Sequence, residues 1–100
     1  MSGKEAKVLL DLNAPTFQSD FFGLDANEVK KMLKTLKKLR GLTWNEVFRD
    51  HGLKWEEVKS MPGRDTIRLS QSYRAVAIHD GAWMRFVALH QDHDGAYGKK

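Results

Sequence analysis

Hydrophobic and polar positions alternate most regularly in the last third of the chain. Three runs rich in β-branched, aliphatic or aromatic residues follow one another there: Thr66–Ser70, Tyr73–His79 and Trp83–His90. Short polar breaks between such runs are typical of neighbouring antiparallel strands. Asp80-Gly81 can supply the two positive-φ residues of a type I′ turn. We therefore expect a tight hairpin between the second and third runs.

Period-two alternation predicts the two faces of this hairpin. The expected pairs are His79 with Ala82, Ala77 with Met84, and Ala75 with Phe86. One face is small and apolar, suited to a covering helix: Tyr73, Ala75, Ala77, His79, Met84, Phe86, Ala88 and His90. The other face mixes aliphatic residues with two arginines, suited to a partly open surface: Arg74, Val76, Ile78, Trp83, Arg85, Val87 and Leu89.

The first half of the chain carries the patterns of one strand and two helices. Val8–Asn13 is a short apolar run typical of an edge strand, and Pro15 breaks it. Thr16–Leu24 has apolar residues at helical spacing. Asp25–Arg40 has an amphipathic stripe, with Asp25 and Glu28 placed as a capping pair. Its remaining positions are rich in lysine, which indicates either a solvated helix face or a phosphate-contacting surface.

The segment between these helices and the strands is less regular. Thr43–His51 begins with an S/T-x-x-E signature, which predicts a further helix. Leu53–Ser60 fits neither the helical nor the strand period, and Pro62-Gly63 marks a loop. Leu42–Met61 resembles a helix-turn-helix, but the paired glutamates of its second piece would repel phosphates. The order of elements predicts an α+β fold over residues 1–100: a single small domain, with an N-terminal strand and two to three helices packed on one face of a C-terminal antiparallel sheet.

Composition limits the classes of function. The chain has 100 residues, no cysteine and a net charge of +4, with no long apolar run. The lack of cysteine excludes disulfides and thiol chemistry and fits a reducing compartment, so we expect a cytoplasmic protein. Because there is no long apolar run, we expect no membrane span. The positive charge favours an acidic partner such as nucleic acid. We also expect no cofactor.

Residues whose side chains could take part in catalysis gather near the C-terminus. Metal binding by His90, His93 and Asp94 matches no strong ligand spacing, and no nucleophile elbow is present. Metal-free RNA cleavage needs a base for the 2′-hydroxyl, cations for the phosphorane, and an acid for the leaving oxygen. The arginines, histidines and tyrosine of this region supply all three types: Arg68, Arg74, Arg85, His79, His90, His93 and Tyr97.

The same region resembles a known family. Ile67-Arg68-Leu69-Ser70, Tyr73-Arg74-Ala75, Phe86–His90 and the closing Tyr97 are similar to the sheet core of RelE/ParE-superfamily toxins, especially the RelE and HigB branch. The N-terminal strand, the phenylalanine-containing segment and the lysine-rich helix fit as well. The resemblance extends from Leu10 to Tyr97. In the tail this chain has Asp92, His93 and Asp94, where many relatives carry additional basic residues.

The resemblance implies a type II toxin that cleaves mRNA on the ribosome without metal and is neutralised by a cognate antitoxin. Arg68 would match the basic residue of the first C-terminal strand, and Arg74 the phosphate-stabilising arginine. Tyr97, His90 or His93 would supply the terminal acid or base. The candidate RNA-binding residues are Lys30, Lys34, Lys37, Lys38 and Arg85. The alternatives are a ParE-like toxin that acts on a protein such as gyrase, and a non-catalytic homologue that only binds nucleic acid or an antitoxin.

Overall fold

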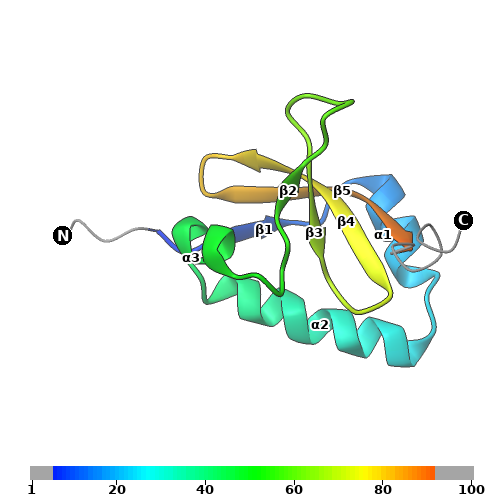
Figure 1. Ribbon diagram of the computed structural model, residues 1–100. Helices are drawn as coiled ribbons and strands as arrows, with labels where there is room; N and C mark the ends of the chain where they lie inside the picture. The colour runs from blue at the N-terminus through cyan, green and yellow to red at the C-terminus, as the bar shows by residue number, and fades with distance from the viewer. Residues whose placement is uncertain (1–5, 92–100) are drawn as a thin grey trace, which may run out of the picture.

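The fold is that of a computed structural model, in which residues 6–91 are described (Figure 1). The helices are α1 (Pro15–Phe22), α2 (Ala26–Arg40) and α3 (Trp44–Arg49). The strands are β1 (Leu9–Asp11), β2 (Glu56–Glu57), β3 (Asp65–Arg68), β4 (Tyr73–Asp80) and β5 (Trp83–Gln91). Within residues 6–91, no helix has the length and apolar character needed to cross a membrane.

The strands form one sheet in the order β1-β5-β4-β3-β2. β1 runs parallel to β5, and the other neighbours are antiparallel. Figure 1 shows α2 running along one side of the sheet, with α1 close to β5. This confirms the expected α+β fold: the helices pack against a mostly antiparallel sheet, and the N-terminal strand lies at its edge.

The core lies between the helices and that face. Its buried side chains come from both layers: Phe17, Phe21, Met32, Leu36 and Leu39 from helices, and Ile67, Ala75, Ala77, Met84 and Phe86 from strands. Two predicted caps are confirmed and explain where helices begin. Asp25 accepts a hydrogen bond from the Glu28 amide at 2.9 Å, and Thr43 forms a reciprocal capping box with Glu46.

The segment after α3 differs from the helix-turn-helix alternative. α3 ends at Arg49, and the Asp50 side chain accepts hydrogen bonds from the amides of Gly52 and Leu53 at 2.9 and 3.2 Å. These bonds stabilise a turn in place of another helical turn. The chain then continues as β2, which pairs with β3. The ambiguous stretch Leu53–Ser60 thus contains a short strand, and the helix-turn-helix interpretation is wrong.

The hairpin register also differs from the prediction. Asp80 pairs with Trp83, so Gly81-Ala82 forms the turn, and His79 pairs with Met84. Gly81 has a φ of +60°, whereas the φ of Ala82 is not positive. A type I′ turn needs a positive φ at both residues and a type II′ turn only at the first, so this turn matches type II′ better. The pairing partners in β5 are shifted by two residues. An even shift keeps each side chain on its predicted face, so the predicted faces are correct as far as Phe86.

Beyond Phe86 the predicted faces are wrong, because β5 contains a bulge. Ala77 pairs with Phe86, but Val76 pairs with Ala88, so Val87 is an extra residue. The extra residue reverses the alternation. Leu89 is therefore buried with the core, and His90 lies on the opposite face.

Candidate nucleic-acid interface

Three of the predicted site residues form a row across β3, β4 and β5. Arg68 lies directly opposite Arg74, and Arg74 lies directly opposite His90. Side chains opposite each other in an antiparallel ladder share a face, with Cβ atoms roughly 5 Å apart. The preceding pair, Ile67 and Ala75, is buried under the helices. The row Arg68–Arg74–His90 therefore lies on the sheet face that the helices leave open.

Hydrogen bonds that Arg74 donates to β3 and to the segment before β2 orient its side chain. Its Nη2 donates to Thr66 Oγ1 at 2.5 Å and to the Lys54 carbonyl oxygen at 3.0 Å. The Glu56 carboxylate lies 3.6 Å from the same nitrogen and is itself well exposed, so this ion pair is weak. A guanidinium has five N–H donors. Both hydrogen bonds use Nη2, so they hold the Arg74 guanidinium in place through one of its three nitrogens.

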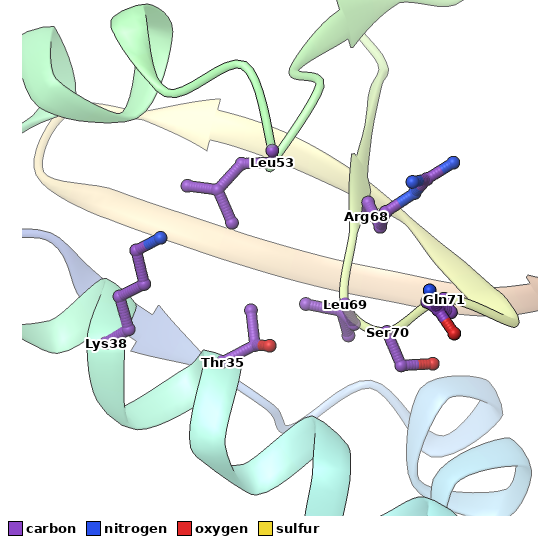
Figure 2. A pocket seen from close by; sticks show the side chains of 8 residues that line it. Thr35, Lys38, Leu53, Arg68, Leu69, Ser70 and Gln71 are labelled. Carbon is purple, nitrogen blue, oxygen red and sulfur yellow. The ribbon is translucent and has the colours of Figure 1, made fainter.

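Arg68 stands between the open face and a neighbouring pocket. Its amide donates to the Leu53 carbonyl at 2.7 Å, which fixes the end of β3 against the turn after α3. The pocket has a volume of about 240 Å³, and its lining is Thr35, Lys38, Gly52, Leu53, Arg68, Leu69, Ser70 and Gln71. Figure 2 shows the Arg68 guanidinium pointing away from Thr35 and Lys38. Arg68 thus lies at the rim of this pocket.

The candidate lysines of α2 do not join the row. Lys30, Lys34 and Lys37 are exposed, whereas Met32, Leu36 and Leu39 of the same helix are buried against the sheet. Because α2 covers the other face of the sheet, these lysines lie on the opposite side of the molecule from the row.

Lys38 has a structural contact of its own. Its Nζ lies 2.7 Å from the Asp50 carboxylate at the turn after α3. The hydrogen bond from Lys38 lowers the pKa of Asp50, and the amides of Gly52 and Leu53 lower it further. Lys38 therefore links α2 to the turn that carries Leu53.

Arg85 lies on the open face but is held by two carboxylates. It contacts Asp80 at 2.9 Å and Asp11 of β1 at 3.0 Å. It pairs with Ile78, four positions along β4 from Arg74. The two acidic partners offset its charge, so Arg85 is a poorer phosphate ligand than its residue type suggested.

His79, near the end of β4, is exposed. It also stacks on the Trp44 ring at a centroid distance of 3.5 Å, with Phe48 and Trp55 around it. Burial raises the pKa of nearby Asp65, Glu57 raises it further, and His79 opposes them. At roughly 3.3 Å per residue along β4, this cluster lies about 16 Å from Arg74.

Two of the predicted catalytic residues, His93 and Tyr97, lie outside the described residues, as do Asp92 and Asp94. Within residues 6–91, no three His, Asp or Glu side chains are grouped as metal ligands.

Sequence reasoning missed Thr66, Lys54 and Asp20, which form hydrogen bonds with Arg74 or with the residue before His90. Thr66 and Lys54 accept hydrogen bonds from Arg74, and Asp20 of α1 accepts one from the Leu89 amide at 3.0 Å. One signal for Asp20 was present in the sequence. It lies three residues after Phe17 and one before Phe21, so in a helix its acidic side chain lies near the apolar face.

Comparison with known proteins adds no relative to this picture: no family model, curated protein or solved structure matches the chain.

Proposed function

We propose that this chain is the toxin of a type II toxin–antitoxin system, a metal-independent endoribonuclease that cleaves mRNA on the ribosome. The observation that supports this most is the row Arg68–Arg74–His90, in which two arginines and a histidine occupy paired positions of β3, β4 and β5 on the sheet face away from the helices. The resemblance to RelE and HigB toxins in the same strands supports the same function.

The row fits the chemistry of cleavage by the RNA's own 2′-hydroxyl. Arg74 and Arg68 stabilise the charge that accumulates on the phosphorane, since guanidinium groups hold phosphate oxygens with two parallel hydrogen bonds. His90 takes or gives a proton at the 2′- or 5′-oxygen. His93 and Tyr97 follow His90 in the chain and are candidates for the second proton-transfer role.

An acidic, amphipathic antitoxin segment suits the helical side of the molecule. Phe22 of α1 and Leu33 of α2 are exposed hydrophobic side chains, with exposures of 73% and 45%. Lysines flank Leu33 on the same helix. A helix or extended segment with apolar and acidic residues would cover both kinds of surface.

The test is induction of the chain from a tightly repressed promoter, followed by amino-acid and nucleoside incorporation and by mapping of new mRNA 5′ ends. We expect protein synthesis to stop first and cleavage to fall within translated regions. His90→Ala should abolish both effects, whereas the matched control His79→Ala should not. Early arrest of DNA synthesis with intact mRNA would instead identify a toxin that acts on a protein such as gyrase.

A second function is favoured by the exposed α2 lysines: a non-catalytic module that binds nucleic acid. Lys30, Lys34 and Lys37 form no ion pair among the described residues. This function predicts harmless expression and an RNA affinity that falls steeply with salt. Replacing the three lysines with glutamine should lower the salt slope by about two, at about 0.7 per phosphate contact on a single strand.

A further inference from the structure

The bulge in β5 decides which face His90 occupies. If the pairing of Ala77 with Phe86 continued without the extra residue Val87, Arg74 would lie opposite Leu89 and Tyr73 opposite His90. Leu89 would then point to the open face and His90 toward the helices. The row Arg68–Arg74–His90 therefore exists because of this bulge.

The bulge also turns the Leu89 amide out of the β4–β5 ladder. Successive backbone amides of a strand point alternately to its two sides, so an extra residue exchanges the sides. The Leu89 N–H points to the side of β5 that β1 covers only along Trp83–Arg85. It donates there to Asp20 Oδ2 at 3.0 Å. Without that acceptor, a part-buried amide would lose its partner, which disfavours the bulged arrangement.

The packing of α1 fixes Asp20 at this position. Phe17 and Phe21 are buried, and the Phe17 ring lies 5.3 Å from the Phe86 ring of β5. Asp20 is three residues after Phe17 and one before Phe21, so all three side chains lie near the face of α1 that packs on β5. The two phenylalanines thus hold the carboxylate against the strand.

We propose that Asp20 is a positioning residue for the site. Its carboxylate accepts the Leu89 N–H, stabilises the bulge, and so keeps His90 beside Arg74. The catalytic consequence rests on the proposed function, whereas the effect on strand pairing does not.

The pairing is tested by NMR on the full-length chain. Because the Leu89 amide points away from β4, Ala75 and Leu89 form a non-hydrogen-bonded pair, whose Hα atoms lie close together. Asp20→Ala should weaken the Hα–Hα cross-peak between Ala75 and Leu89 by about half or more. Asp20→Asn, which keeps a carbonyl acceptor, should retain it, as should the neighbouring control Ser19→Ala. An unchanged cross-peak in Asp20→Ala would overturn the proposal. Should that variant fail to fold, Asp20→Glu, which displaces the carboxylate, replaces it.

A double-mutant cycle tests the catalytic consequence. Asp20→Ala should lower kcat for RNA cleavage by about tenfold and leave KM nearly unchanged, because a displaced acid or base affects the proton transfer and not binding. In a His90→Ala background it should have no further effect. Independent, multiplying effects would show that Asp20 does not act through His90. If the wild-type chain does not cleave RNA, the proposed function falls and the cross-peak alone decides the role of Asp20.

Discussion

Arg74 combines a structural and a proposed catalytic role in one side chain. It is only 14% exposed, and its Nη2 bonds to Thr66 and to the Lys54 carbonyl. Its position on the sheet face away from the helices is where the proposed function requires a phosphate ligand. The two roles can be separated, because one structural acceptor, the Thr66 hydroxyl, can be removed without removing the cation.

Arg74→Lys should reduce RNA cleavage by about 100-fold, because an ammonium cannot reproduce the bidentate geometry of a guanidinium. The control is Thr66→Val, which removes one acceptor and keeps the cation. We expect the control to cost about 1 kcal/mol of unfolding free energy in urea denaturation and to leave cleavage within about tenfold of wild type. Equal losses of cleavage in both variants would assign Arg74 to structure alone.

The two histidines of the hairpin should have opposite roles. His79 stacks on Trp44, so His79→Ala should lower the free energy of unfolding by about 1 kcal/mol and leave cleavage unchanged. His90 is exposed and lies beside Arg74, so His90→Ala should leave stability unchanged and lower kcat by at least about 100-fold. Urea denaturation and a cleavage assay on both variants give the comparison. The opposite pattern would place the site at the Trp44 cluster.

Asp50 should make stability depend on pH. Its folded pKa is lowered, mainly by the hydrogen bond from Lys38. A lowered carboxylate pKa stabilises the fold above the unfolded pKa of about 3.9, and this contribution is lost as pH falls through the folded value. Asp50→Asn should therefore lower the urea midpoint at about pH 7 and have little effect at about pH 2. An equal decrease of the urea midpoint at both pH values would mean that the ionised Asp50 carboxylate does not contribute to stability.

At the scale of elements, the β4–β5 turn depends on Gly81. Its φ of +60° is unfavourable for residues with a Cβ, although a Cβ there would meet no atom within 4 Å. Gly81→Ala should therefore cost about 1–2 kcal/mol of unfolding free energy through backbone strain alone. Gly41→Ala, at a φ of −95° with room for a methyl group, is the matched control and should have little effect. Thermal denaturation of both variants measures the difference, and equal Tm values would contradict the type II′ assignment.

Apart from β2 (Glu56–Glu57), the elements were predictable from local signals. The caps at Asp25 and Thr43, the amphipathic stripe of α2 and the alternation in the last strands act over a few residues, so they are readable in the sequence. The hairpin register was not readable, because Asp80-Gly81 and Gly81-Ala82 are both plausible two-residue turns. The bulge was hidden for a different reason, since burial of Leu89 and the Asp20 carboxylate stabilise it through tertiary contacts.

At the scale of the molecule, the sequence predicted the α+β class and three residue types of the candidate site. It did not show which charges share a surface. Lys34 and Arg74 both carry a positive charge, and the sequence does not show that they lie on different surfaces. The sheet separates them, because α2 packs on the face opposite the row. The sequence likewise gave no sign that Asp11 and Asp80 would pair with Arg85.

The most direct test of the central claim is cleavage of mRNA in purified ribosomes stalled at a defined codon, read by primer extension. The wild-type chain and Arg85→Gln should cut the mRNA in the ribosome at similar rates. His90→Ala and Arg74→Lys, once shown to be folded, should cut it at least about 100-fold more slowly. Wild-type rates in both of these folded variants would contradict the assignment of the row Arg68–Arg74–His90 as the cleavage site.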